Sequence, residues 1–294
     1  MAAYAAVRLL AWAARALPLA LSYGLTRAGG VLAYYAWVGG RRRCVGNMLH
    51  VTGGDEAEAR RLARSSFANY GAYLVDFVRL IGASPEEVQR RVIFDGWERI
   101  EAERAGNGII FVTAHYGLWD LGAVALSAHG LPVTTIADRF ANTKLDGLIL
   151  GTRERLGLTI VASDRVGPGV LRALKHDEIT ALHIDIPFPD SSVVVEFFGA
   201  PMAVTDAFAR LALRAGAPVL AATLPREGRG SERVRARVER VAFEPTGDAE
   251  RDAHELTQAT FRALESQIRD DPAQWYIFRR LWPETAAAPA GSAA

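Results

Sequence analysis

The chain has few of the residues that usually carry covalent or metal chemistry. Cys44 is the single cysteine among 294 residues, so an internal disulfide is excluded. No cysteine–histidine cluster has the spacing of a zinc site, and no His-Glu-x-x-His occurs. A Gly-x4-Gly-Lys-Ser/Thr loop, a Gly-x-Gly-x-x-Gly turn and a Gly-x-Ser-x-Gly elbow are also missing. Nucleotide hydrolysis, dinucleotide redox chemistry and serine hydrolysis by that elbow therefore lose support, and we expect no metal and no cofactor.

Acidic residues are missing from the beginning of the chain. The net charge is only +1, which argues against a dedicated nucleic-acid binder. Residues 1–54 nevertheless contain no acidic residue, and their basic residues are Arg8, Arg15, Arg27, Arg41, Arg42 and Arg43. Arginines interrupt the apolar runs there before any run reaches the roughly 20 residues that cross a bilayer.

This basic, apolar front end predicts two helices lying in the membrane interface, with arginines toward anionic lipid. A signal peptide competes with this interpretation, but no convincing cleavage site follows. Ordinary core helices are the other alternative, although buried helices rarely carry arginines without acids nearby. We expect residues 1–40 to form interfacial helices and residues 1–43 to contact the inner (plasma) membrane from its cytoplasmic face.

The rest of the chain is organised around residues 108–120. An apolar, β-branched run from Gly108 to Thr113 predicts a buried strand, and helical periodicity begins near Gly117. His115 therefore follows a strand at the carboxyl edge of a sheet, where open α/β sheets place ligand sites. Asp120 could accept the Nδ1 proton of His115 and so leave Nε2 free as a general base. A histidine satisfied by a backbone carbonyl is the structural alternative.

Strand and helix patterns alternate beyond this stretch, which predicts βαβ units and a substantially parallel sheet. The fold class is therefore α/β, a single domain over residues 41–284 with a mostly parallel central sheet flanked by helices. The N-terminal membrane-docking helices precede it, and residues 285–294 form a disordered tail of small residues. Further strands are expected at 92–94, 133–137, 158–162, 179–185, 192–198, 218–224 and 234–243, the last as a half-exposed edge. Helices are expected at 55–80, 143–156, 168–175, 206–214 and 252–269.

The block Thr113-Ala-His-Tyr-Gly-Leu-Trp-Asp120 resembles the His-x4-Asp block of the lysophospholipid acyltransferase superfamily. It is most similar to the branch of bacterial lipid A and phosphatidylinositol mannoside acyltransferases, although Leu118 stands where that branch usually has asparagine. The resemblance covers roughly residues 40–283 and is strongest at this block, at Phe197-Phe198-Gly199 and at the closing stretch 274–283.

Four other candidate positions match the resemblance less closely. Arg139 and Arg153 resemble family arginines, and arginine can bind two phosphate oxygens at once, so both are candidate substrate contacts. A surface salt bridge is the alternative for each. Asp185 begins a stretch similar to the family's Asp-x-x block and is a further candidate substrate-binding residue or third partner of His115. The family's usual glutamate is missing at Val194, and Glu196, on the same strand face, is the candidate catalytic substitute.

The resemblance implies transfer of a fatty acyl group from acyl-CoA or acyl carrier protein to a hydroxyl of a membrane glycolipid or phospholipid. His115 would act as general base and Asp120 would orient it, without a protein nucleophile or metal. Backbone amides after Gly117 would stabilise the oxyanion. Two alternatives stay open: a thioesterase or lipid hydrolase using the same His/Asp pair, and a catalytically silent membrane-binding homologue.

Overall fold

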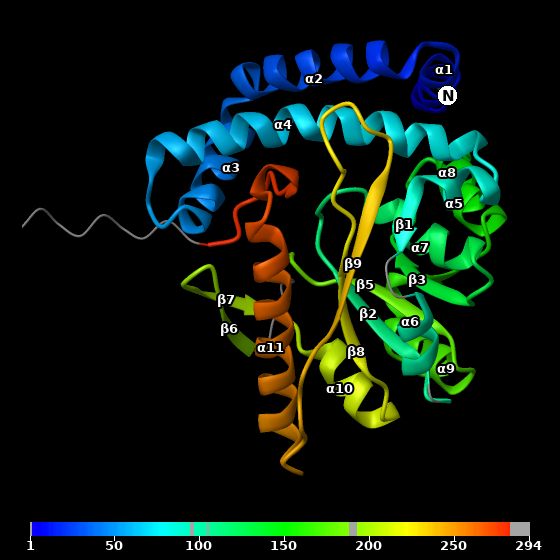
Figure 1. Cartoon of the computed structure of the whole chain (residues 1–294), viewed down its shortest axis with the longest axis vertical. Helices are drawn as coiled ribbons and strands as arrows, with labels where there is room; N and C mark the ends of the chain where they lie inside the picture. The colour runs from blue at the N-terminus through cyan, green and yellow to red at the C-terminus, as the bar shows by residue number, and fades with distance from the viewer. Residues whose placement is uncertain (1, 95–96, 105, 188–192, 283–294) are drawn as a thin grey trace, which may run out of the picture.

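A seven-stranded sheet forms the centre of the protein, as seen in a computed structural model that describes residues 2–94, 97–104, 106–187 and 193–282 (Figure 1). The strand order is β1-β9-β8-β2-β5-β3-β4, and every neighbouring pair is parallel except β8 and β9. The strands are β1 (Val92–Phe94), β2 (Ile109–Thr113), β3 (Val133–Ala137), β4 (Leu158–Ala162), β5 (Ile179–His183), β8 (Val219–Thr223) and β9 (Val234–Arg240). The expected mostly parallel α/β sheet is confirmed.

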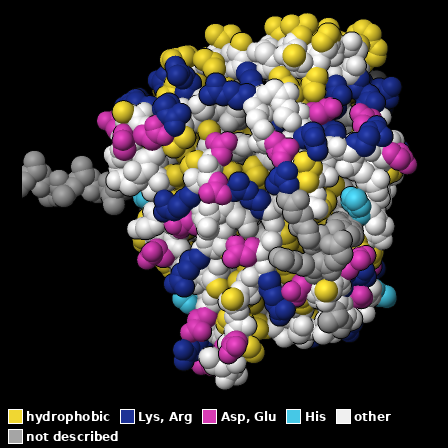
Figure 2. Space-filling view, viewed as in Figure 1, with side chains coloured by type: hydrophobic (Ala, Val, Ile, Leu, Met, Phe, Trp, Pro, Cys, Tyr) yellow, Lys and Arg dark blue, Asp and Glu magenta, His cyan; other side chains and the backbone are white. Residues whose placement is uncertain are grey.

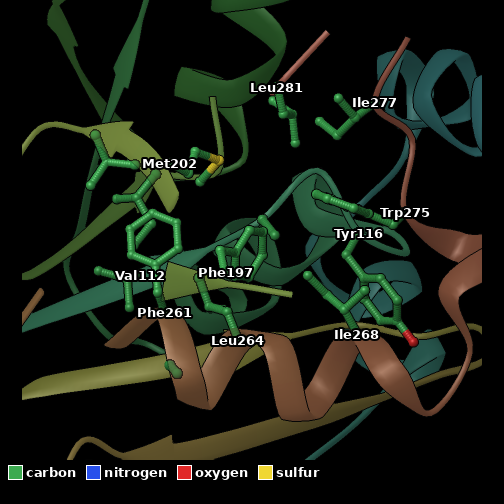
Figure 3. Close-up of a cluster of buried hydrophobic side chains, with 14 of the residues drawn as sticks. Val112, Tyr116, Phe197, Met202, Phe261, Leu264, Ile268, Trp275, Ile277 and Leu281 are labelled. Atoms are coloured by element: carbon green, nitrogen blue, oxygen red, sulfur yellow. The ribbon is translucent and has the colours of Figure 1, made fainter. Parts of the chain in front are cut away.

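Alternating residues of β2 enter two different hydrophobic cores. Ile109 and Phe111 pack with α7 (Trp119–Ala128), whereas Ile110 and Val112 pack with α9 (Val166–Lys175) and α11 (Ala249–Arg269). A strand buried on both faces is apolar throughout, which explains the continuous apolar run of β2. The core on the α11 side also holds Phe197, Phe261 and Trp275 (Figure 3). From residue 80 onward the remaining helices are α5 (Pro85–Arg91), α6 (Trp97–Glu103), α8 (Thr143–Arg155) and α10 (Ala207–Ala215). Short 3₁₀ turns are η1 (Leu80–Gly82), η2 (Ser163–Arg165) and η3 (Pro272–Gln274).

Four helices lie at the carboxyl end of the parallel strands: α1 (Ala2–Ala16), α2 (Leu19–Ala36), α3 (Val38–Val51) and α4 (Glu56–Arg79) (Figure 1). The backbones of α2 and α4 approach closely, because a Cβ at Gly30 would lie 2.2 Å from the Phe67 carbonyl oxygen and one at Gly71 would lie 2.1 Å from that of Thr26. The expected division at residue 40 falls within α3, and the expected tail 285–294 lies outside the described residues.

A buried ionic cluster also joins α2 to the rest of the molecule. The Asp76 carboxylate on α4 accepts a hydrogen bond of 2.8 Å from the Tyr23 hydroxyl on α2 and is paired with both Arg91 and Arg226. All four side chains are buried. Removing α2 would take from this buried cluster both the Tyr23 hydroxyl that donates to Asp76 and the Tyr23 ring that packs against Arg226.

The outer sides of α1 and α2 remain apolar and exposed. Hydrophobic side chains gather along the top of the molecule in Figure 2, where Figure 1 places these two helices. We define the exposed apolar face as Leu9, Leu10, Trp12, Leu17, Leu21, Leu25, Leu32 and Tyr35. Among the described residues, no helix has both the length and the hydropathy needed to span a bilayer.

One strand prediction was wrong about the position in the sheet, and another predicted strand lies outside the main sheet. The expected edge strand β9 lies between β1 and β8, because the three residues Val92–Phe94 pair with its first half. The strand expected at 192–198 is β6 (Val193–Phe197), which forms an antiparallel hairpin with β7 (Ala200–Val204) outside the main sheet. Residue 192 itself lies outside the described residues. The left-handed Phe198 and Gly199 make the turn of this hairpin, and β6 packs on α11.

Candidate active site

His115 and Asp185 are brought together by the register of two neighbouring parallel strands. Thr113 at the end of β2 lies opposite His183 at the end of β5, so the residues two positions further on lie side by side. The Nδ1 atom of His115 lies 2.8 Å from Oδ1 of Asp185, and the backbone amide of His115 donates to Oδ2 at 2.8 Å. The indole Nε1 of Trp275 donates to the same Oδ2 at 2.9 Å. Asp185 is completely buried, so its orientation relative to His115 is fixed.

The loop after His115 is held by backbone hydrogen bonds from two distant segments. The Tyr276 amide donates to the His115 carbonyl at 2.8 Å, and the Gly117 amide donates to the Gln274 carbonyl at 2.9 Å. The Leu118 amide donates to the Leu224 carbonyl at 2.8 Å. Gly117 has φ +64°, and a Cβ there would lie 2.0 Å from the Leu224 carbonyl oxygen. Only glycine therefore permits this strand-to-helix turn.

Asp120 does not contact Nδ1 of His115, contrary to the expectation from the His-x4-Asp spacing. Its Oδ1 atom pairs with the Arg153 guanidinium at 2.5 Å, and its Oδ2 atom accepts a hydrogen bond of 2.6 Å from the Tyr73 hydroxyl. Tyr73 comes from α4 and stacks on Trp119, with ring centroids 4.2 Å apart. Asp120 is in the first turn of α7. Its negative charge raises the pKa of His115 without a direct contact at Nδ1.

The electrostatics of the pair favour a proton on His115. Burial lowers the pKa of His115, but the charge of Asp185 and its hydrogen bond outweigh burial, so the pKa lies above its ordinary 6.5. Burial raises the pKa of Asp185, but the neighbouring His115 and the Trp275 indole more than offset it, so the net shift is downward. Asp185 is therefore a carboxylate that holds the Nδ1 proton, and Nε2 of His115 is left as the proton acceptor.

A second histidine lies beside the first. The rings of His183 and His115 have centroids 4.8 Å apart. Burial, together with the charge of His115, lowers the pKa of His183 to about 4. His183 is therefore neutral at physiological pH and leaves His115 as the titrating histidine of the site.

An apolar pocket of about 210 Å³ extends from His115 beneath α7. Its polar lining consists of Thr113, His115, Asp120, Thr135, Arg153 and His183. Most of the remaining lining is apolar and comes from α7 and from all seven strands of the sheet, with Phe94, Phe111, Leu126, Ala222 and Val238 among its residues. A larger groove of about 1010 Å³ lies between α4 and the end of α11 and does not include His115.

Two sequence candidates lie away from this pocket. Arg139 is 71 % exposed and pairs with Asp146 at 2.9 Å, which is the surface salt bridge considered as its alternative. Glu196 is an exposed residue of β6, and its backbone pairs with the Gln258 side chain of α11. Val194 is exposed on the same strand face. The structure therefore brings together His115, Asp185, Asp120 and Arg153, but neither Arg139 nor Glu196.

Tyr73, Trp275 and His183 belong to the site but are not among the sequence candidates. Tyr73 and Trp275 are aromatic residues in segments whose pattern is also typical of core residues. Their sequence pattern therefore does not distinguish them from ordinary packing residues. His183 could have been found from the parallel pairing of β2 with β5, since both strands end in polar residues.

A histidine base, a buried orienting carboxylate and an apolar pocket define a site suited to base-catalysed transfer of an apolar group to a hydroxyl. Comparison with known proteins identifies the class. The model of the bacterial lipid A biosynthesis acyltransferase family matches residues 2–284, and the chain belongs to this family. It is therefore an acyltransferase, and the expected lipid A and phosphatidylinositol mannoside branch is confirmed.

The two sequence relatives below agree with the family, and one solved structure is reported for its similarity alone. The chain is 27 % identical over 260 residues to a phosphatidylinositol mannoside acyltransferase of Mycobacterium tuberculosis, covering 85 % of this chain and 79 % of that protein. A lipid A biosynthesis acyltransferase of Haemophilus influenzae is 29 % identical over 142 residues, or 47 % of this chain and 44 % of that protein. A 1-acyl-sn-glycerophosphate acyltransferase of Thermotoga maritima has a TM-score of 0.37 at 18 % identity, covering 84 % of this chain and 96 % of that chain.

Proposed function

We propose that this acyltransferase moves a fatty acyl group from a thioester, on CoA or acyl carrier protein, to a hydroxyl of a membrane glycolipid or phospholipid. The observation that carries the proposal is the His115–Asp185 pair at the mouth of an apolar pocket. The family and its relatives, which are named for lipid A and phosphatidylinositol mannoside, support a lipid acceptor.

In this mechanism Nε2 of His115 takes the proton of the acceptor hydroxyl as its oxygen attacks the thioester carbonyl carbon. A tetrahedral intermediate forms, its C–S bond breaks, and the imidazolium returns the proton to the leaving thiolate. Asp185 stabilises the imidazolium and fixes the tautomer, as the aspartate of a serine-protease triad does. No protein nucleophile takes part.

The oxyanion needs donors at the start of α7. The sequence suggested the amides after Gly117, and the first of them, that of Leu118, already donates to the Leu224 carbonyl. The next amides, those of Trp119 and Asp120, are in the first turn of α7, where amides have no intrahelical acceptor. Arg153 is adjacent through its pair with Asp120 and supplies positive charge. We assign oxyanion stabilisation to these groups.

The pocket beneath α7 suits the hydrocarbon part of the donor. Most of its lining residues are apolar, so a fatty chain placed there leaves water while its carbonyl stays at the histidine. Asp120, held by Arg153 and Tyr73, is part of the polar lining.

The exposed apolar face of α1 and α2 would bring the acceptor to this site. We propose that this face lies in the interfacial layer of the inner membrane, on the cytoplasmic side, with Arg41, Arg42 and Arg43 toward anionic lipid. The contact with the membrane is thus made by residues 1–43.

The experiment that tests the function is radiolabelled acyl transfer by the purified protein in mixed micelles containing candidate lipid acceptors. His115→Ala should lower acylated lipid by at least about 10³-fold, because the general base is lost. His176→Ala, on an exposed histidine at the end of α9, is the matched control and should behave as wild type. Acyl release that is equal with and without acceptor would instead indicate a thioesterase, and unchanged transfer by His115→Ala would exclude His115 as the base.

A further inference from the structure

A polar side chain without a hydrogen-bond partner lines the pocket beneath α7. His183 is the last residue of β5 and lies opposite Thr113 in the parallel pairing with β2. Its imidazole lines the pocket and is half-buried. The Nε2 atom of His183 is buried, and no group within the described part of the chain forms a hydrogen bond with it. Because buried polar atoms are paired in most native structures, this unpaired nitrogen requires a physical reason.

The place of His183 in β5 turns its side chain toward the pocket. Side chains alternate along a strand, so His183 shares a face with Ile179 and Ala181. Those two residues pack on the α7 side of the sheet, whereas Leu182 packs in the core on the α11 side. An apolar residue at the end of β5 would fill the same space without burying an unpaired nitrogen. Packing alone therefore does not explain a histidine at this position.

The imidazole of His183 lies next to the catalytic base. Its ring centroid is 4.8 Å from that of His115, and 6.0 Å from that of Trp119. These ring contacts involve no hydrogen bond, and the χ2 torsion of a histidine side chain has broad, roughly two-fold preferences. A turn about χ2 exchanges ring nitrogen and carbon positions. A nitrogen of His183 can therefore face a polar group that is bound beside His115.

The protonation state of His183 suits a hydrogen-bond donor. A pKa of about 4 keeps its imidazole neutral at physiological pH, so one ring nitrogen carries a proton. A neutral N–H donates to a carbonyl oxygen, and more strongly to the oxyanion that this oxygen becomes in a tetrahedral intermediate. Such a weak base does not compete with His115 for the proton of the acceptor hydroxyl. The two neighbouring histidines are therefore suited to different tasks.

We propose that His183 is a further catalytic residue, whose ring N–H donates to the carbonyl oxygen of the acyl group during transfer. This inference rests on the proposed function and adds a donor on the sheet to those at the start of α7. As the hydroxyl oxygen attacks the carbonyl carbon, the C=O bond becomes a single bond and negative charge gathers on the oxygen beside His183. When the C–S bond breaks, the C=O bond forms again, and His183 keeps its proton throughout.

The test compares His183→Leu with His183→Gln in acyl transfer by the full-length protein. Leucine fills a similar volume without a donor, whereas glutamine keeps an amide N–H near the position of Nε2. His183→Leu should lower kcat by about 10²–10³-fold with KM nearly unchanged, the usual effect of losing one oxyanion donor. His183→Gln should recover most of this loss. His176→Leu, on the exposed histidine after α9, is the control and should have the wild-type kcat.

The folding of the variants is checked by thermal melting. The melting temperature of His183→Leu should not fall, because the substitution removes a buried polar atom that has no partner. Wild-type kcat in His183→Leu would overturn the proposal. A raised KM at unchanged kcat would overturn it as well, because the lost contact would then be one that substrate and transition state share.

A carbonyl probe separates a hydrogen bond from a packing role, including the case in which both His183 variants lose activity. The probe is methyl pentadecyl ketone with an isotope-labelled carbonyl, an unreactive stand-in for the acyl group. Its bound C=O stretching frequency should be lower in the wild type than in His183→Leu, because a hydrogen bond weakens the C=O bond. Equal frequencies, or no binding of the ketone to the wild type, would contradict the proposal. If no donor supports transfer, the proposed function fails, while the ketone frequency still decides whether His183 donates to a carbonyl.

Discussion

In the proposed mechanism, the role of His115 depends on one direct contact that fixes its proton. Asp185 accepts the Nδ1 proton at 2.8 Å and is itself held by the Trp275 indole. Asp120 supplies charge from the first turn of α7 but is held by Tyr73 and Arg153. The proposed mechanism therefore gives the two carboxylates near this imidazole different tasks: Asp185 orients the base and Asp120 organises the mouth of the pocket.

The raised His115 pKa predicts a specific pH profile. A general base must be neutral, so kcat/KM should fall about tenfold per pH unit once the pH is below a His115 pKa that lies above 6.5. In Asp185→Asn the residual activity should have its acid limb at lower pH, because the charge that raises the pKa is gone. Profiles of kcat/KM over the range from pH 5 to 9 check this, and coincident acid limbs in the two proteins would contradict it.

The pH dependence of folding stability has the opposite sign to that of activity. A histidine whose pKa is higher in the folded state adds stability below its unfolded pKa, and loses it as pH rises through the folded value. The form of His115 that is active as a base is therefore not the form that adds most to stability.

At the scale of elements, the loop between β2 and α7 positions the base. Gly117 makes the turn, and segments 224 and 274–276 hold its backbone. Gly117→Ala should lower the melting temperature by several degrees and activity by at least about tenfold, because left-handed strain of about 1–2 kcal/mol adds to the clash with Leu224. Gly130→Ala is the matched control, since Gly130 has φ +88° with open space around it. Equal melting temperatures for the two variants would contradict the close approach.

If the acyl chain lies in the pocket beneath α7, as we propose, the pocket limits the length of that chain. Ala222→Leu places extra carbon atoms in the pocket and should reduce kcat/KM for long-chain relative to short-chain donors by about tenfold, since one methylene in a tight pocket is worth about 1–3 kcal/mol. Ala221→Leu enlarges the neighbouring residue on the other face of β8, in the other core. A series of saturated donors of increasing length measures the profile. The same profile for both variants would place the chain elsewhere.

The sequence predicted much of this arrangement and missed specific parts of it. The apolar run at 109–113, the alternation of strand and helix and the position of His115 follow from local pattern. The partner at Nδ1 does not, because it depends on the register of β2 and β5, 70 residues apart. Local spacing suggested Asp120, which α7 turns toward Arg153 and Tyr73 instead. The short strand β1 pairs with the first half of β9. The alternation of arginine and apolar residues in β9 does not reveal this pairing.

At the scale of the whole molecule, one surface is apolar and the catalytic residues lie at the sheet end beneath α4. Family membership and the exposed apolar face of α1 and α2 together favour an enzyme that works at a membrane. Since α2 shares the buried Tyr23–Asp76 contact with α4, deleting residues 1–40 would disturb the fold as well as the surface. Point substitutions are the cleaner probe of docking.

Trp12→Glu/Leu32→Glu should reduce co-sedimentation with anionic vesicles by at least about tenfold. Both side chains are about two-thirds exposed, at 68 % and 69 %. Burying each of them in the membrane interface contributes about 1.5–3 kcal/mol to binding. Val194→Glu, on the exposed face of β6, is the control for a new surface charge and should sediment as wild type. Equal sedimentation of all three proteins would count against docking through α1 and α2.

The most direct test of the central assignment compares Asp185→Asn with Asp120→Asn in single-turnover acyl transfer. If Asp185 orients His115, Asp185→Asn should lower the rate by about 10³–10⁴-fold, as expected when the orienting carboxylate of a base is made neutral. Asp120→Asn keeps the shape of the residue and should cost less, about 10–10²-fold, because it weakens only the pocket mouth and a secondary charge. A large loss in Asp120→Asn beside near wild-type rates in Asp185→Asn would contradict the assignment.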